Sequence, residues 1–560
     1  MRSRFFVSAS LILFLACTHT GAVVYVSQTG DNTTGTSWST AFTSLQAAID
    51  YAAGPPAEAV WVGQGNYVLT SSLTVAAGVA LYGGFPASGG EMQDRNPALY
   101  STTLDGDGSL YPVVSIDTVD NVRLDGFGVT GAYGAGPDNN GAGVLCDDSS
   151  GVVIENCKVY GNQSPGSPSS GAGIMCMYSD VVIQNCDISG NAVSNNSGGI
   201  SGYYATIDIS STSVSNNTYG ESGGGCGFWY CTVSVVDCEI SNNTGGFNGG
   251  GVFCHNCSAA TFERTRITGN SASFIGGGIT TYDTPLIMTS CTVSGNTAYK
   301  GGGVEVHGSS SGSVSLRGCL IAENAASDIG GGVFTGLAGL PMTLSYCTIA
   351  GNTAGSQGGG VFVNDSSTTI SDTILAGNTK LAVYEGDAAY DAVVTRCLFF
   401  NNLDGCYYDI DTGTAYFDVT GPAGLDENVA EVTGNLQTDP CFVDPVTGDY
   451  HLGYTSPCID AAFAVAPSVD VDGNTRPFDV PYHAGEGPNS YDTGCYELVL
   501  DPSDDTDGDG VNNLLESIAG TDPLDDTQWP EVPAAGLVGL VAAVVAIGLL
   551  SLSRLRRTGR

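Results

Sequence analysis

The chain has 560 residues, 80 of them glycine, and a formal net charge of −41. So acidic a chain repels nucleic acid and anionic lipid surfaces, and it attracts cations such as Ca²⁺. Hydrophobic residues make up 42% of the chain and charged residues only 13%, which argues against wholesale disorder. We therefore expect a folded protein that does not bind nucleic acid.

Residues 1–22 have the pattern of a signal peptide. Two arginines precede an apolar run over residues 5–16, and small residues follow before position 22. The protein is therefore expected to be exported to the cell surface or cell envelope. In an alternative interpretation, Cys17 is the lipidated cysteine of a lipoprotein signal.

One template recurs ten times between residues 154 and 402. It consists of an apolar residue, two spacers, Cys or Thr, one spacer, an apolar residue, two spacers and Asn, and its period averages about 27 residues. The Cys or Thr positions are Cys157, Cys186, Thr212, Cys238, Thr265, Cys291, Cys319, Cys347, Thr373 and Cys397. The asparagines are Asn162, Asn191, Asn217, Asn243, Asn270, Asn296, Asn324, Asn352, Asn378 and Asn402.

The template predicts an all-β fold, a right-handed parallel β-helix. Its segments are short, rich in Val, Ile, Thr and Ser, and separated by Gly and Asn, which is typical of strands. Three short strands fill one coil, and parallel crossovers are right-handed in about 98% of cases. We expect the template's Cys or Thr and its two apolar positions to point inward and to stack on their equivalents one coil away.

The turn residues of the template have expected roles of their own. The asparagines should lie at turns, tolerate left-handed backbone geometry and form a hydrogen-bonded ladder. A glycine run in the same period, such as Gly276 to Gly278, should take positive φ at a corner that admits no Cβ.

The chain contains 18 cysteines, and export favours disulfides. Thr replaces Cys at three of the ten template positions, however, and buried Cys packs as a small apolar residue. We therefore expect mostly free, packed thiols. A few bridges remain open, between Cys254 and Cys257 or among Cys406, Cys441, Cys458 and Cys495.

The domain organisation follows from these patterns and from what flanks them. Residues 44–52 have the apolar spacing of a capping helix. We expect a signal peptide (1–22), an N-terminal cap with irregular coils (23–100), β-helix repeats (101–410), closing coils and a C-terminal cap (411–497), an acidic calcium-binding linker (498–530) and a membrane segment (531–560).

Residues 23–497 resemble bacterial right-handed parallel β-helix surface proteins. The resemblance rests on the opening Tyr25-Val26-Ser27, on the glycine and asparagine repeats, and on closing segments such as Ser456 to Asp460 and Asp492 to Glu497. The repeats are also similar to those of chlamydial polymorphic outer-membrane proteins. The resemblance implies the fold and says little about the activity.

Residues 505–516 match the twelve-residue EF-hand-like calcium loop. Gly510 supplies its sharp turn, and Pro502 leaves no normal entering helix, so the loop resembles thrombospondin type 3 or dockerin repeats. The alternative is an acidic linker without metal. The expected Ca²⁺ ligands are Asp505, Asp507, Asp509, the Val511 carbonyl, Asn513 and Glu516.

Residues 534–553 are about twenty apolar or small residues, and four arginines follow them. This is long enough for a transmembrane helix with its basic tail in the cytoplasm. The segment resembles bacterial sorting signals of the exosortase type. A permanent anchor is the alternative.

No catalytic set stands out in the coils. Known β-helix lyases and hydrolases use clustered Asp or a basic residue beside Ca²⁺-binding Asp, whereas Arg264 and Arg266 suggest a solvent-facing strip. The histidines, His19, His255, His307, His451 and His483, have no metal-binding spacing. The aromatic residues Tyr203, Tyr204, Phe228, Trp229 and Tyr230 either stack on sugar rings or pack between coils.

The sequence therefore favours a membrane-tethered surface protein with a non-enzymatic role in adhesion, carbohydrate binding or envelope structure. Its expected partners are polysaccharides or glycans of host or neighbouring cells, and Ca²⁺ is its only expected cofactor. The alternative is a β-helix lyase or glycoside hydrolase that acts on acidic polysaccharide.

Overall fold

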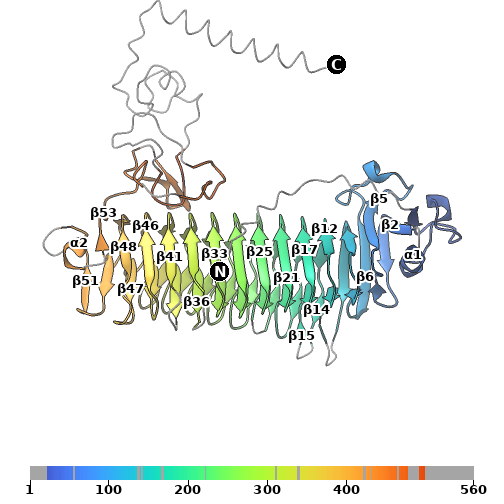
Figure 1. Cartoon of the computed structure of the whole chain (residues 1–560), viewed down its shortest axis with the longest axis horizontal. Helices are drawn as coiled ribbons and strands as arrows, with labels where there is room; N and C mark the ends of the chain where they lie inside the picture. Colours follow the sequence, from blue (N-terminus) through green and yellow to red (C-terminus); the bar gives the residue numbers. More distant parts are fainter. Residues whose placement is uncertain are drawn as a thin grey trace, which may run out of the picture.

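The computed structural model describes residues 22–498, with gaps at 55–56, 135–138, 141–142, 166–168, 221, 309–311, 337–340, 421–423, 430–431, 454, 463–465 and 477–490. These residues form a long solenoid whose successive coils pair strand to strand in parallel (Figure 1). The predicted all-β parallel solenoid is confirmed.

Two of its four main sheets follow one another in each coil and are called sheets A and B. Sheet A contains β1 (Ala22–Val26), β2 (Ala57–Gly63), β5 (Ala80–Phe85), β8 (Arg123–Asp125), β12 (Val152–Glu155), β17 (Asp180–Gln184), β21 (Thr206–Ser210), β25 (Thr232–Val236), β29 (Ala259–Glu263), β33 (Leu286–Thr289), β37 (Val314–Arg317), β41 (Met342–Ser345), β45 (Thr368–Ser371), β48 (Val393–Thr395) and β52 (Val432–Thr433). Sheet B contains β3 (Gly65–Val68), β6 (Thr102–Leu110), β9 (Phe127–Ala132), β13 (Lys158–Tyr160), β18 (Asp187–Ser189), β22 (Ser213–Ser215), β26 (Glu239–Ser241), β30 (Arg266–Thr268), β34 (Thr292–Ser294), β38 (Leu320–Ala322), β42 (Thr348–Ala350), β46 (Ile374–Ala376), β49 (Leu398–Phe400) and β53 (Leu436–Gln437).

The other two sheets complete the coil. Sheet D contains the two-residue strands β14 (Gln163–Ser164), β19 (Ala192–Val193), β23 (Thr218–Tyr219), β27 (Thr244–Gly245), β31 (Ser271–Ala272), β35 (Thr297–Ala298), β39 (Ala325–Ala326) and β43 (Thr353–Ala354). Sheet C contains β4 (Leu73–Thr74), β7 (Val114–Asp117), β11 (Val144–Asp147), β16 (Ile174–Met177), β20 (Ile200–Tyr203), β24 (Cys226–Trp229), β28 (Val252–His255), β32 (Ile279–Tyr282), β36 (Val304–His307), β40 (Val333–Gly336), β44 (Val361–Val363), β47 (Val383–Glu385), β50 (Tyr407–Asp409) and β51 (Thr414–Tyr416).

One coil therefore runs through sheets A, B, D and C, as in β21, β22, β23 and β24. Sheet D is the difference from the three strands expected per coil. Outside the main sheets, β10 (Asn139–Asn140) pairs with β15 (Ser169–Ser170), and β54 (Phe442–Asp444) pairs with β55 (Asp449–Leu452).

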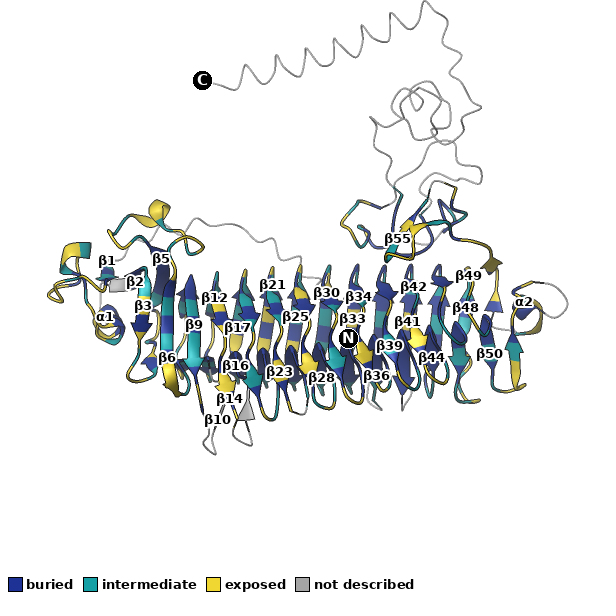
Figure 2. Cartoon of the chain, turned by 180° about the vertical axis from the view of Figure 1, so that it is seen from behind, coloured by how far each residue is buried: buried dark blue, intermediate teal, exposed yellow. Residues whose placement is uncertain are grey.

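The inward positions of the template form the core (Figure 2). In one coil, Ile209, Thr212, Val214 and Asn217 are each 2% exposed or less. Register pairs each inward residue with its equivalent one coil away, as in Ile209 with Val235. The stacking predicted from the repeat is confirmed.

The template asparagines form a buried hydrogen-bonded ladder. Asn217 donates from its backbone N–H (2.9 Å) and from Nδ2 (3.1 Å) to Oδ1 of Asn243, and its Nδ2 also donates to the Ile188 carbonyl at 2.9 Å. The expected left-handed geometry belongs instead to the residue before each ladder asparagine, such as Asn216 (φ 55°) or Gly190 (φ 63°). The corner residue turns the chain, which frees the asparagine side chain to point inward.

Glycine is required in the run for two separate reasons. Only its first residue takes positive φ, as in Gly276 (φ 61°). The next two lie against the following coil, where a Cβ on Gly277 or Gly278 would be 2.5 Å from the carbonyl oxygen of Gly302 or Gly303. No side chain fits at that distance, so the prediction of a corner without room for Cβ holds there.

All 17 cysteines that the structure describes are free thiols, and all except Cys441 are buried. The thiols at the Cys or Thr positions of the template, called the ladder thiols, donate to backbone carbonyls, as Cys157 does to the Leu124 oxygen at 3.4 Å. The packed-thiol interpretation therefore describes this structure, and the bridges left open among the described cysteines are absent from it.

Short helices lie at both ends of the coil stack (Figure 1). Helix α1 (Leu45–Ala52) begins after Ser44, whose side chain accepts from the Ala47 N–H, and it buries Leu45 and Ile49 against the first coils. At the other end, α2 (Leu425–Asn428) buries Leu425 in the same core. Two 3₁₀ turns, η1 (Trp38–Thr40) and η2 (Met92–Asp94), lie near the N-terminal end.

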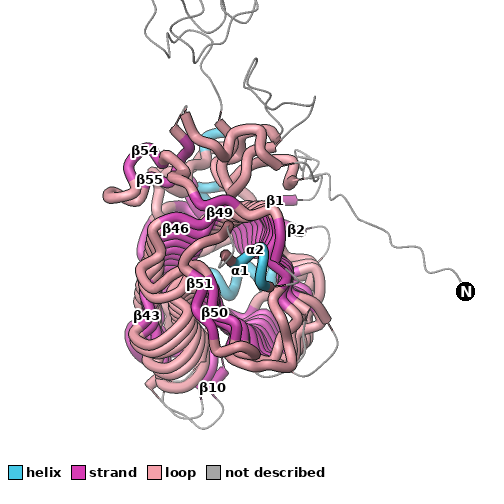
Figure 3. Tube along the Cα trace, turned by 90° about the vertical axis from the view of Figure 1, so that its left-hand side faces the viewer, coloured by secondary structure: helices cyan, strands magenta, loops and turns pink. Residues whose placement is uncertain are grey.

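The predicted closing segment divides into two parts. The described residues of 411–437 end the coils, but those of 438–498 fold back along the outer face of sheet B (Figure 3). Their apolar side chains cover Leu320, Ala350 and Ile374, which point out of the solenoid. These outward apolar residues explain why this part lies beside the stack and does not cap its end.

Apart from Ala22 and Leu498, three predicted segments lie outside the described residues: the signal peptide, the calcium linker and the membrane segment. Over the part of the chain that the structure describes, no helix is long and apolar enough to span a bilayer.

Candidate functional site

The outer face of sheet B changes character along the solenoid. The first outward position of each strand is polar in five successive coils, at Lys158, Asp187, Ser213, Glu239 and Arg266. Further along, the same column contains Leu320, Ile374 and Leu398, each 6% exposed or less. We call the polar outer face of strands β13, β18, β22, β26 and β30 of sheet B the open floor.

The first wall, residues 86–101, stands at the N-terminal end of the open floor. Arg95 fixes it to the coils, since it donates to the Gly83 carbonyl at 2.6 Å and forms an ion pair with Asp125. Pro97 packs so closely on Gly84 that a Cβ there would lie 2.7 Å from the Pro97 Cα. Both contacts hold this loop against the sheet.

The second wall, which consists of the described residues of 438–498 without 454, 463–465 and 477–490, stands at the other end. Ser290 Oγ donates to the Val469 carbonyl at 2.9 Å just before β34, and the Cys495 N–H donates to Thr348 Oγ1 at 3.2 Å. Inside the wall, Arg476 and Glu497 form a fully buried ion pair at 2.8 Å. Figure 1 shows the two walls projecting from the same side of the solenoid, with the coils of β12 to β25 between them.

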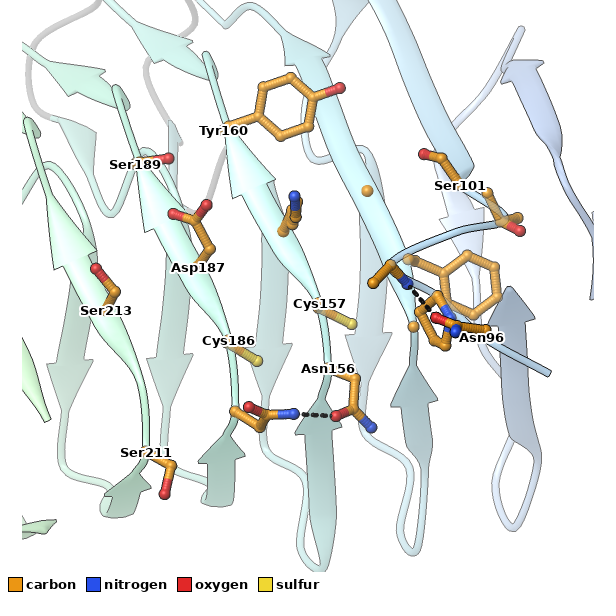
Figure 4. A pocket seen from close by; sticks show the side chains of 18 residues that line it. Asn96, Ser101, Asn156, Cys157, Tyr160, Cys186, Asp187, Ser189, Ser211 and Ser213 are labelled. Carbon is orange, nitrogen blue, oxygen red and sulfur yellow. Dashed lines mark hydrogen bonds between the residues drawn. The ribbon is translucent and has the colours of Figure 1, made fainter. Parts of the chain in front are cut away.

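A groove of about 810 Å³ lies between the first wall and the open floor. In Figure 4, Tyr160, Asp187 and Ser213 come from three successive strands, and Asn156 lies at the corner before the first of them. Asn185 lies at the equivalent corner one coil on. The groove lining combines hydroxyl, amide and charged groups with apolar ones, including Pro97 and Phe127. Its polar groups exchange hydrogen bonds with a polar ligand, and the exposed ring of Tyr160 adds one apolar face.

The charged side chains of the open floor form no ion pairs among the residues described, although Arg266 lies near Tyr496 of the second wall. Lys158 pairs in register with Asp187, and Glu239 pairs with Arg266. Within the described residues, none of these four side chains takes part in an ion pair. Two positive and two negative groups are thus available to a ligand, without net charge.

The aromatic residues predicted to contact sugar lie on sheet C and its corner. Phe228 points into the core and is fully buried, so it cannot contact a ligand. Tyr204 stacks in parallel between Tyr178 (5.6 Å) and Tyr230 (4.7 Å). Rings cover both faces of Tyr204, so its contacts between coils match the packing alternative, while Tyr178, Tyr204 and Tyr230 remain 54%, 48% and 41% exposed.

Two histidines have partners that the sequence did not reveal. On sheet C, His307 Nε2 lies 2.5 Å from Oε1 of the fully buried Glu305, whose pKa is raised by burial. On the second wall, His451 lies between Asp449 (2.5 Å) and Asp472 (2.6 Å). Hydrogen bonds to these carboxylates raise the pKa of His451 to about 9.

The two arginines predicted to form one solvent-facing strip lie in different surroundings. Arg264 lies at the corner before β30 and donates to both carboxylate oxygens of Asp237, whereas Arg266 belongs to the open floor. The predicted calcium ligands, His19 and His483 lie outside the described residues. Among the residues described, no group of three or more His, Cys, Asp or Glu side chains could hold a metal ion.

Two family models match the coils. The model of the right-handed β-helix region matches residues 142–321, and that of the periplasmic copper-binding protein NosD matches residues 233–435. Together with the parallel sheets, these matches define the class: a right-handed parallel β-helix protein. No curated protein sequence matches the chain.

Three solved structures are similar to this chain, each with a TM-score of 0.32. The A-module of the Azotobacter vinelandii mannuronan C-5 epimerase AlgE6 is 14% identical, over 71% of this chain and 94% of its own. PfbA, a surface adhesin of Streptococcus pneumoniae, is 10% identical, over 65% and 89%. The pectate lyase Pel9A is 14% identical, over 85% and 96%.

Proposed function

We propose that this β-helix protein binds polysaccharide on the open floor of sheet B, in a non-enzymatic role at the cell surface or in the cell envelope. The observation that carries the proposal is the groove of about 810 Å³, lined by amide, hydroxyl and charged groups from successive coils. Equivalent outward positions recur from one strand to the next, at a spacing of about 4.8 Å. The sugar units of an extended polysaccharide repeat at nearly this distance, so each coil can contact one sugar unit.

The proposal includes export and tethering. The signal-peptide pattern of residues 1–22 and the match to a family of periplasmic proteins support export. The apolar segment 531–560 would hold the protein to the membrane, either permanently or until a sorting enzyme processes it. The acidic linker 498–530 would bind Ca²⁺ through its twelve-residue loop.

One observation favours a second candidate, a glycoside hydrolase. Asp187 and Glu239 lie two strands apart on the open floor with Ser213 between them, so their backbones are about 10 Å apart. A water-filled separation of roughly 6.5–9.5 Å between two carboxyl groups suits an inverting hydrolase. Asp187→Asn and Glu239→Gln would each abolish such an activity.

The test is binding of the full-length protein to a panel of immobilised neutral and acidic polysaccharides. Retention on at least one neutral polysaccharide, lost in Ser213→Trp and kept in Thr343→Trp on sheet A, is the expected result. No retention on any member would overturn the proposal. Release of new reducing ends from the retained polysaccharide would favour the hydrolase.

A further inference from the structure

The open floor has a definite length. It starts beside the first wall, and after β30 the second wall reaches the coil of β34 through the contact of Ser290 with Val469. Lys158 and Arg266, on the first and last open strands, are four strand spacings apart, about 19 Å. A linear ligand along the solenoid axis therefore meets a barrier at both ends.

The charges of the floor identify the ligand class. Lys158 and Arg266 mark its ends, Asp187 and Glu239 lie inside, and the four charges cancel. The chain as a whole carries −41, so its field repels a polyanion, and the floor has no cationic excess to offset that repulsion. Free carboxylates and cations instead accept from and donate to hydroxyl groups.

We infer that the open floor binds an uncharged oligosaccharide stretch of about five sugar units, one per strand from β13 to β30. This inference rests on the proposed polysaccharide binding and specifies the length and charge of the bound stretch. A longer chain must leave the floor at a wall, so its further sugars make no contact. Lys158 and Arg266 bind hydroxyls at the two ends of the stretch.

The experiment is calorimetry of the full-length protein with uncharged oligosaccharide ladders of two to ten units: cello-, chito-, xylo-, manno- and malto-oligosaccharides. Oligogalacturonates of the same lengths are the acidic comparison. In at least one uncharged ladder, affinity should rise at least tenfold between two and five units and then change less than twofold up to ten. Oligogalacturonates should bind more weakly at every length.

Variants test where the stretch ends. In the oligosaccharide series that binds, Lys158→Ala and Arg266→Ala should each lower the affinity for the five-unit ligand about tenfold. Each should change the affinity for the two-unit ligand by less than twofold. Lys300→Ala, which removes a cation on the loop before sheet C, is the matched control and should change neither. Retained structure is checked by circular dichroism.

The outcomes separate this inference from the function it rests on. Affinity that keeps rising beyond eight units, or tighter binding of oligogalacturonates, contradicts the inference while polysaccharide binding stands. The absence of binding in every uncharged ladder also contradicts it. If the polysaccharide panel is negative as well, the proposed function falls too.

Discussion

Asn217 and Asn243 lie one coil apart, and the Asn217 amide donates to Oδ1 of Asn243 at 3.1 Å. Asn243 repeats the arrangement, since its Nδ2 donates to the Val214 carbonyl at 2.9 Å and to Asn270 Oδ1 at 3.0 Å. Each ladder side chain thus satisfies buried groups in two neighbouring coils. The ladder ties each coil to the next and keeps the open floor in register.

Asn243→Ala should destabilise the solenoid by about 3 kcal/mol, because it leaves the buried Asn217 N–H and Nδ2 without their acceptor. Urea unfolding followed by circular dichroism measures the effect as a lower midpoint. Asn242→Gly is the control: Asn242 is exposed at φ 55°, a conformation that glycine adopts freely, so its midpoint should stay within error. An equal decrease of the urea midpoint in the two variants would contradict the role of the asparagine ladder.

The thiols should react in two classes. Burial raises the pKa of the Cys397 and Cys231 thiols to about 12, and a thiol rather than a thiolate reacts poorly. Mass spectrometry after a short treatment of the native protein with iodoacetamide should find Cys441 modified first among the cysteines described. The buried ladder thiols, Cys319 with its lowered pKa among them, are enclosed by the coils and out of reach of the reagent, so they should react only after unfolding. Disulfide-linked peptides between ladder positions would contradict the packed-thiol structure.

Docking of the second wall should depend on pH through His451. Its pKa, about 9, lies above the ordinary value of 6.5, so the folded state binds the proton more tightly than the unfolded state does. The stabilisation is fully present below about pH 6.5 and is lost as the pH rises through about 9. Amide exchange in residues 442–452, corrected for the intrinsic rate, should therefore accelerate between those values.

His451→Gln supplies the comparison for that measurement. Gln cannot be protonated, so corrected exchange in the same peptide should be nearly independent of pH over this window. An unchanged pH dependence in the variant would assign the effect to another group.

Calcium should bind to the linker after the second wall. Titration of the full-length protein with Ca²⁺ should show one site that Asp505→Ala and Glu516→Ala remove, because each loses a ligand of the predicted loop. Asp525→Ala, an acidic residue of the same linker outside the loop, is the matched control and should retain the site. Identical titrations of all variants would exclude this loop as the site.

The sequence predicts the interior of the solenoid better than its exterior. Inward positions such as Ile209 and Val214 repeat at fixed spacing in every coil, so their pattern alone identifies them. The second wall could have been inferred from the outward column, which changes from Glu239 and Arg266 to Leu320. What covers those residues depends on contacts between distant segments, such as Cys495 with Thr348, which no local pattern contains.

The candidate site was missed for the same reason. Asp187 and Ser213 are ordinary outward residues of their strands, and only the first wall, which comes from residues 86–101, makes their surface part of a groove. The aromatic residues that the sequence offered as sugar contacts lie on sheet C and its corner, where Tyr204 stacks between Tyr178 and Tyr230.

The most direct test of the central claim, that polysaccharide binds on the open floor of sheet B, is hydrogen-exchange mass spectrometry of the full-length protein with and without a bound oligosaccharide. Protection is expected in peptides covering residues 156–160, 185–189 and 211–215. Protection confined to sheet A or to the aromatic corner at residues 203–204 and 229–230, with these peptides unchanged, would contradict it.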